Sequence, residues 1–157
     1  MMAFLVKIES IMVKIVKGDL FSGPVDIIAH GCNCKNGFGS GVAGAMSLHH
    51  PRAKAAYHAK YFKDGWKLGD VQFVISGNQT IANCATQNEY FPRNKVHCDY
   101  HSIRLAMEKV KEFAKAGNFS VGIPKIGCGL AGGDWSIVKG ILDEVFSDYD
   151  LTVFVQD

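Results

Sequence analysis

Two glycine-rich segments have residue types and spacing that could do chemistry. They are Gly37-Phe38-Gly39-Ser40-Gly41 and Gly127-Cys128-Gly129-Leu130-Ala131-Gly132-Gly133. Each follows an apolar, β-branched run and precedes a stretch of helical periodicity, so backbone N–H groups and the positive end of a helix dipole would converge there. Glycine also lets the backbone approach a ligand that a Cβ atom would repel. Each segment is therefore predicted to cradle an anion such as a phosphate.

The second segment also matches the dinucleotide fingerprint, with glycines at Gly127, Gly129 and Gly132. That fingerprint belongs to a Rossmann unit, which needs several strands after its helix. Only one strand-like run follows here, over residues 151–155. The position in the chain therefore argues against a nicotinamide dinucleotide. A tight turn with no ligand remains the alternative explanation of these glycines.

A polar stretch, His30-Gly31-Cys32-Asn33-Cys34-Lys35-Asn36, precedes the first glycine segment. It could place an imidazole and an amide beside bound phosphates. Its His-x-Cys-x-Cys spacing is tighter than the usual zinc knuckle, and His97-Cys98 is the one further pair of ligand type downstream. We therefore expect neither a metal ion nor a cofactor. Cys32 could be a nucleophile or a half-buried structural thiol.

Two aspartates flank these segments. Asp19, in Gly18-Asp19-Leu20-Phe21, could close a turn or accept a hydrogen bond from a ligand amine. Asp134 directly follows the second glycine segment, where it could cap a helix, act as an acid or base, or do both.

The elements that must position these residues alternate along the chain, which is typical of an α/β fold. The expected strands cover residues 13–16, 25–30, 71–75, 80–85, 120–126 and 151–155. The expected helices cover residues 41–61, interrupted at Pro51, then 97–116, ended by Gly117 as a C-cap, and 135–146. Ser76-Gly77-Asn78 predicts a hairpin turn, so the sheet should be mixed.

The two glycine segments each follow a strand that we expect near the middle of this sheet. If both strands lie there, their carboxyl ends bring both segments to one edge, where α/β proteins bind ligands. Two anion cradles side by side would suit a diphosphate.

Composition limits the class of protein. The chain has 157 residues, of which 48% are hydrophobic, and this suits a single domain over 1–157. Lysine and arginine total 17 against 15 acidic residues, without a basic stripe, so nothing favours nucleic acid. The five cysteines suit reduced thiols, and no run reaches the ~20 apolar residues of a membrane span. We expect a cytoplasmic monomer, whose residues 1–11 before Met12 form an extension or an extra strand.

Taken in order, several segments resemble the macrodomain family. They are Gly18-Asp19-Leu20-Phe21, Ile28-Ala29-His30-Gly31-Cys32-Asn33, the segment around Gly39, and Ile123-Pro124-Lys125-Ile126-Gly127-Cys128-Gly129-Leu130. Within the family, His30-Gly31-Cys32-Asn33-Cys34 and the following glycines are most similar to the ADP-ribose-1″-phosphate phosphatase branch. The stretch from Gly129 to Trp135 is similar to bacteriophage members, which implies action in a host cytoplasm. The resemblance implies a three-layer α/β/α macrodomain with a mixed, about six-stranded sheet.

The resemblance also implies that the ligand is ADP-ribose or its 1″-phosphate. Asp19 would bind the adenine amino group with Leu20 beside it, Phe154 would stack near adenine, and Asn33 would hold the distal ribose. The backbone of the two glycine segments would bind the diphosphate and the distal ribose, through Gly39, Ser40, Gly41, Val42, Gly127, Cys128, Gly129, Leu130 and Ala131.

Three functions are compatible with this resemblance. The first is a phosphatase that removes the terminal phosphate of ADP-ribose-1″-phosphate, with His30 and Asp134 as acid and base. The second is a hydrolase that removes ADP-ribose from protein or nucleic acid, and the third is a reader that binds ADP-ribose without turnover. Lysine-dependent hydrolases of the family carry a lysine where this chain has Gln87, which forms no Schiff base, and an aspartate where it has Ala131.

Overall fold

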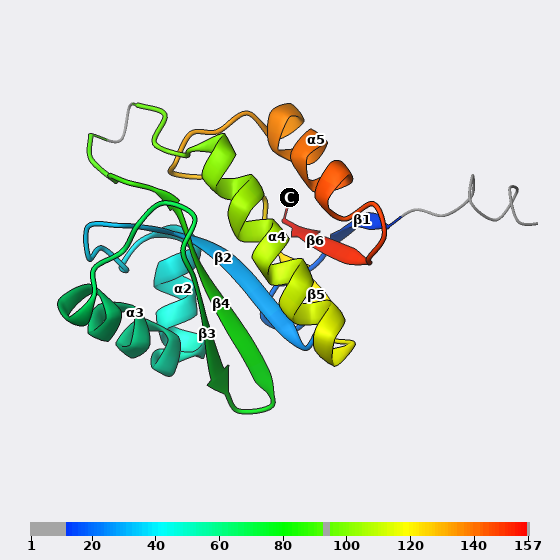
Figure 1. Ribbon diagram of the computed structural model, residues 1–157, viewed down its shortest axis with the longest axis horizontal. Helices are drawn as coiled ribbons and strands as arrows, with labels where there is room; N and C mark the ends of the chain where they lie inside the picture. Colours follow the sequence, from blue (N-terminus) through cyan, green and yellow to red (C-terminus); the bar gives the residue numbers. More distant parts are fainter. Residues whose placement is uncertain (1–11, 93–94, 157) are drawn as a thin grey trace, which may run out of the picture.

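Six strands form one mixed sheet in the computed structural model, which describes residues 12–92 and 95–156. The strands are β1 (Val13–Lys17), β2 (Ile27–Asn33), β3 (Val71–Ser76), β4 (Gln79–Gln87), β5 (Val121–Ile123) and β6 (Leu151–Val155). Across the sheet their order is β1-β6-β5-β2-β4-β3 (Figure 1). Only the β3–β4 pair is antiparallel among these described strands, which confirms the mixed sheet and the hairpin. The expected N-terminal extension, residues 1–11, lies outside the described residues.

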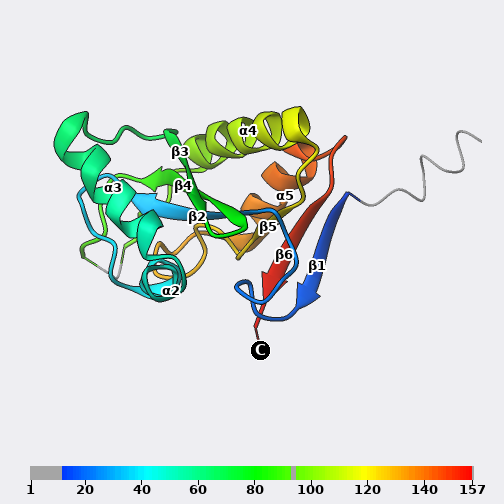
Figure 2. The same ribbon diagram turned by 90° about the horizontal axis from the view of Figure 1, so that it is seen from below.

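Four helices in the described part of the chain cover the two faces of the sheet. They are α2 (Gly41–His49), α3 (Pro51–Lys63), α4 (Tyr100–Gly117) and α5 (Trp135–Val145). Figure 2 shows α2 and α3 on one face and α4 and α5 on the other. The expected three-layer α/β/α architecture is therefore confirmed. None of the helices within 12–92 and 95–156 combines the length and apolar character that a membrane crossing needs.

The core is divided by the sheet because successive side chains of a strand point to opposite faces. In β2, Ile27 and Ala29 join the apolar cluster under α4 and α5, whereas Ile28 and Cys32 join the cluster under α2 and α3. β2 is buried on both faces, and its sequence begins with three apolar residues, Ile27, Ile28 and Ala29. The strand is thus a rigid central support for the loop that follows it.

The helix ends follow local chemistry. α2 ends at His49, His50 is its C-cap, and Pro51 begins α3. The expected interruption of the helix at Pro51 is therefore confirmed. Asp134 caps α5, and its Oδ1 accepts from the N–H of Ser136 at 2.9 Å, so the expected N-cap is confirmed. The expected C-cap at Gly117 is wrong by one residue. Asn118 takes the left-handed position, with φ 56°, and Gly117 is the last helical residue.

Two strand boundaries differ from expectation near the glycine segments. β2 continues to Asn33, three residues beyond the expected end at His30. β5 ends at Ile123, because Pro124 has no N–H to donate to the neighbouring strand. The carbonyl of Pro124 instead accepts from the N–H of Ile126, at 2.8 Å. The loop after β5 therefore begins at Pro124 instead of Gly127.

Candidate ligand-binding site

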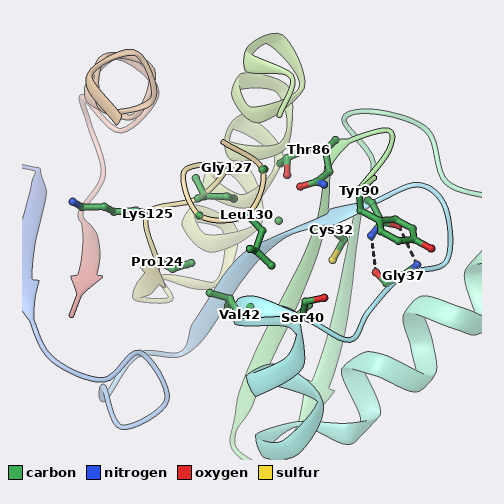
Figure 3. Close-up of a pocket in the computed structure, with 18 of the residues that line it drawn as sticks. Cys32, Gly37, Ser40, Val42, Thr86, Tyr90, Pro124, Lys125, Gly127 and Leu130 are labelled. Atoms are coloured by element: carbon green, nitrogen blue, oxygen red, sulfur yellow. Dashed lines mark hydrogen bonds between the residues drawn. The ribbon is translucent and has the colours of Figure 1, made fainter. Parts of the chain in front are cut away.

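The two glycine segments meet at one edge of the sheet. β2 and β5 are parallel neighbours, with Ile27 opposite Val121 and Ile28 opposite Gly122. Their carboxyl ends therefore lie side by side, as the sequence predicted, and a cavity of about 600 Å³ lies between the loops that follow them (Figure 3). Its described lining is Gly31, Cys32, Asn33, Gly37, Gly39, Ser40, Gly41, Val42, Ala43, Thr86, Gln87, Tyr90, Pro124, Lys125, Ile126, Gly127, Gly129, Leu130 and Ala131.

The first loop, residues 37–43 and here called the α2 loop, brings the N-terminus of α2 to the cavity. Ser40 is the N-cap residue, but its side chain makes no capping hydrogen bond. The N–H groups of Gly41, Val42 and Ala43 belong to the first turn, where a helix supplies no acceptors of its own. Gly41 has φ +59°, which favours glycine at the turn into the helix. The cavity is thus edged by open backbone donors.

The second loop, residues 124–133 and here called the β5 loop, is held by its own backbone. Gly133 N–H donates to Gly127 O at 2.7 Å and Gly132 N–H donates to Gly129 O at 3.0 Å. Among the described residues, the structure shows no acceptor for the N–H groups of Gly129, Leu130 and Ala131. This second set of donors lies across the cavity from the first. The two loops approach closely, because a Cβ atom on Gly41 would lie 3.4 Å from Leu130 Cδ1.

Asn33 lines the cavity and shapes the turn beyond β2. Its Oδ1 accepts from the N–H groups of Lys35 and Gly37 and from the hydroxyl of Tyr57, at 2.9, 3.1 and 2.9 Å. Its Nδ2 donates to Gly37 O at 2.7 Å, which leaves one amide hydrogen for a ligand. The side chain is therefore fixed before any ligand arrives.

Four expected ligand-binding residues do not line the cavity. Asp19 and Leu20 follow β1 and Phe154 lies on the neighbouring strand β6, where Gly18 N–H donates to Val155 O at 3.0 Å. Asp19 is exposed, and hydrogen bonds from the N–H of Phe21 and the hydroxyl of Ser22 lower the pKa of its carboxyl.

Cys128 is the fourth of these residues, and its amide already has a partner within the loop. Its N–H donates to Lys125 O at 3.1 Å, so this amide is not open to an anion. Its side chain packs against the core under α4 and α5, and burial raises the pKa of the thiol to about 11. Cys128 thus supports the β5 loop from behind.

The structure places His30 and Asp134 away from the cavity lining. His30 is fully buried, its ring lies edge-on to Phe38, and burial lowers the pKa of its imidazole to about 4. Asp134 is an exposed helix cap, and hydrogen bonds from the hydroxyl and N–H of Ser136 lower the pKa of its carboxyl. Neither side chain is among the described residues that line the cavity, so their part in acid–base chemistry stays a prediction.

Cys32 does line the cavity, but its surroundings keep it a thiol. Its Sγ lies 3.8 Å from His30 Nε2, and that same nitrogen lies 2.6 Å from Asn83 Oδ1. Asn83 Nδ2 donates to two carbonyl oxygens, so its Oδ1 accepts from His30, and Nε2 holds a hydrogen instead of receiving one from Cys32. Burial raises the pKa of the Cys32 thiol well above its usual value. The geometry therefore argues against a cysteine nucleophile.

The sequence did not predict that the end of β4 and the loop after it line the cavity. Thr86, Gln87 and Tyr90 all line it, and Tyr90 packs over Gly37, since a Cβ atom there would lie 2.9 Å from Tyr90 Cε1. An aromatic residue in a polar loop after a strand was the available signal. Within residues 12–92 and 95–156, no group of three or more His, Cys, Asp or Glu side chains could hold a metal ion.

Comparison with known proteins identifies the family. No family model matches the chain. A solved structure described as a macrodomain protein from Streptomyces coelicolor is 30% identical, with a TM-score of 0.78 over 92% of this chain and 99% of that one. The chain therefore belongs to the macrodomain family.

Three curated proteins are similar to this chain along nearly its whole length. An uncharacterized 17.5 kDa protein of Enterobacteria phage T4 is 28% identical over 90% of this chain and 95% of its own length. An ADP-ribose 1″-phosphate phosphatase of Candida albicans is 27% identical, over 92% of this chain and 99% of its own length. An ADP-ribose glycohydrolase of Bos taurus is 27% identical, over 94% of this chain and 92% of its own length.

Proposed function

We propose that this macrodomain binds ADP-ribose 1″-phosphate and hydrolyses it to ADP-ribose and phosphate. The proposal depends on one observation. Backbone N–H groups without an acceptor among the described residues, in the α2 loop and in the β5 loop, line the same cavity. N–H groups at a helix N-terminus and in a glycine turn bind phosphate oxygens without a charged side chain. Two such edges suit the two phosphates of a diphosphate, and relatives named as phosphatases of this substrate support the choice.

The proposed orientation follows the strand order. Asp19 and Phe154 lie at the β6 side, where the carboxylate would accept from the adenine amino group and the ring would stack on adenine. The diphosphate would lie between the two loops, at Gly39, Ser40, Gly41 and Val42 on one side and Gly127, Gly129, Leu130 and Ala131 on the other. The distal ribose and its terminal phosphate would then face Asn33 and the end of β4.

The reaction needs a water oxygen to bond to the terminal phosphorus while the bond from phosphorus to the anomeric oxygen breaks. A water proton ends on the departing oxygen. The described lining holds no carboxylate or imidazole, so the chain's contribution would be positioning and stabilisation of phosphoryl charge by N–H groups. Lys125 lines the cavity, but its Nζ lies 5.4 Å from the centre of the Trp135 ring, and Figure 3 shows it pointing away.

That same lining supports one alternative, a protein that binds ADP-ribose without hydrolysing anything. A reader needs the open amides and no acid or base. The hydrolase function is disfavoured only in its lysine-dependent form, because Gln87 lines the cavity with an amide where those enzymes carry the lysine that forms a Schiff base.

Calorimetric titration with ADP-ribose, followed by measurement of phosphate release from ADP-ribose 1″-phosphate, tests the proposal. Binding with phosphate release supports it, and binding without release assigns the reader function instead. Absence of ADP-ribose binding would overturn both. Incubation with mono-ADP-ribosylated protein in parallel detects the glycosidic activity, which we expect to be absent.

A further inference from the structure

Thr86 occupies an irregular position at the end of β4. Cys32 of β2 pairs with Ala85, and the next residue of β2, Asn33, pairs with Gln87. Thr86 is therefore the extra residue of a β-bulge. Bulges change the direction of a side chain and are over-represented beside active sites. The backbone of Thr86 is fixed, because its carbonyl accepts from the N–H of Asp99 at 2.7 Å.

The hydroxyl of Thr86 has no partner among the described residues. Its Oγ1 is buried without a hydrogen bond, although the residue lines the cavity. The residue as a whole is 0% exposed. Buried hydroxyl groups in folded proteins almost always have a partner, from the protein, from ordered water or from a ligand. A ligand group or an ordered water at this end of the cavity would supply that partner.

Gly31 leaves the space that this hydroxyl occupies. A Cβ atom at position 31 would lie 2.5 Å from Thr86 Oγ1 and 3.4 Å from Ile126 Cγ1. Any larger residue at position 31 would push the hydroxyl away. The chain thus keeps Oγ1 in place at the cavity without satisfying it.

The place of Thr86 along the sheet edge indicates which part of a ligand it would meet. β4 lies on the far side of β2 from β5 and β6, so Thr86 and the pair Asp19 and Phe154 lie on opposite sides of the two loops. Figure 3 shows Thr86 and Tyr90 on one side of the cavity and Pro124 and Lys125 on the other. A ligand with its adenine at Phe154 would extend its other end toward Thr86.

We propose that Thr86 Oγ1 hydrogen-bonds the distal ribose unit of the ligand and so makes the site select ADP-ribose over ADP. This inference rests on the proposed function, because the orientation of the ligand does. Thr86 is a specificity-determining residue in this account and moves no proton in the reaction.

Calorimetry with ADP-ribose and with ADP, which lacks the distal ribose, tests this directly. Thr86→Val keeps the shape of the side chain and removes the hydroxyl. We expect it to weaken ADP-ribose binding by ~10-fold, the usual effect of one lost hydrogen bond to a ligand, and to leave ADP binding unchanged. Thr86→Ser, which keeps a hydroxyl, should restore most of the preference for ADP-ribose over ADP. Thr80→Val, at the opposite end of the same strand, is the matched control and should bind both ligands as the wild type does.

The unfolding temperature of Thr86→Val shows whether the variant folds, and the binding results distinguish failure of this inference from failure of the proposed function. Thr86→Val should unfold at the same temperature as the wild type or a higher one, because it replaces an unsatisfied buried hydroxyl with a methyl group. If it does not fold, Thr86→Ala takes its place in the same comparison. Suppose that the wild-type protein binds ADP-ribose. This inference alone is overturned if Thr86→Val binds ADP-ribose as tightly as the wild type, or if its affinities for ADP-ribose and ADP fall by the same factor. Wild-type protein that fails to bind ADP-ribose overturns the proposed function as well.

Discussion

His30 Nε2 lies 2.6 Å from Asn83 Oδ1, and both residues are completely buried. Asn83 Nδ2 in turn donates to Ala53 O of α3 and to Gln72 Oε1 of β3, each at 3.0 Å. This chain of hydrogen bonds ties three strands to a helix directly beneath Cys32. His30 is therefore part of the support of the cavity.

The protein should lose stability in acid through His30. Its folded-state pKa is about 4 against an ordinary value of 6.5, so the unfolded chain takes up the proton first as the pH falls. The contribution of His30 to the free energy of unfolding is therefore fully present above pH 6.5. As the pH falls from 7 to 4, this group alone should lower the free energy of unfolding by about 3 kcal/mol. Denaturant titrations at a series of pH values measure the loss.

His30→Gln, which keeps a donor toward Asn83, should flatten this pH dependence. His101→Gln removes an exposed histidine of α4 and should leave the dependence as in the wild type. An equally steep loss of stability in acid for the His30 variant would show that other groups are responsible.

Cys32→Ala should retain phosphate release from ADP-ribose 1″-phosphate within about three-fold, because a thiol with a raised pKa supplies little thiolate. Iodoacetamide labelling at neutral pH, followed by mass spectrometry, should modify Cys32 slowly in the folded protein. A variant that binds ADP-ribose normally but has lost turnover would make Cys32 a nucleophile after all.

Gly129→Val tests the β5 loop. A Cβ atom at Gly129 would meet nothing within 4 Å, so the variant should fold, but its side chain would crowd the edge that the diphosphate needs. We expect ADP-ribose affinity to fall by at least ~10-fold, or about 1.4 kcal/mol. Gly140→Val in α5 also adds a Cβ in open space and is the matched control. Equal affinities for the two variants would place the ligand elsewhere.

Asp134→Ala should lower the unfolding temperature and leave kcat/KM for ADP-ribose 1″-phosphate within about two-fold, because the carboxylate caps α5 outside the cavity. Asp134→Asn, which keeps a capping oxygen, should restore the unfolding temperature. A large loss of turnover in both variants, with binding unchanged, would return Asp134 to the reaction.

The sequence predicted the elements well where local chemistry determines them. Pro51, the turn at Gly77 and the cap at Asp134 each act within a few residues, and all three lie where expected. The meeting of the two glycine segments at one edge was expected on the condition that both strands lie near the middle of the sheet, and the pairing of β2 with β5 is a finding of the structure.

The site was harder to predict because it depends on which way side chains point. His30 shares a face of β2 with Ile28 and Cys32 and packs against Phe38, which a polar residue at a strand end does not reveal. Thr86 reaches the cavity through a bulge, and a bulge depends on the pairing of two distant segments. Tertiary register therefore decided what residue type alone left open.

The most direct test of the central claim is the rate of phosphate release from ADP-ribose 1″-phosphate in the presence of increasing ADP-ribose. We expect saturable release that ADP-ribose inhibits competitively, because both molecules would occupy the cavity between the α2 loop and the β5 loop. Absence of release by a protein that binds ADP-ribose, or release that ADP-ribose does not inhibit, would contradict it.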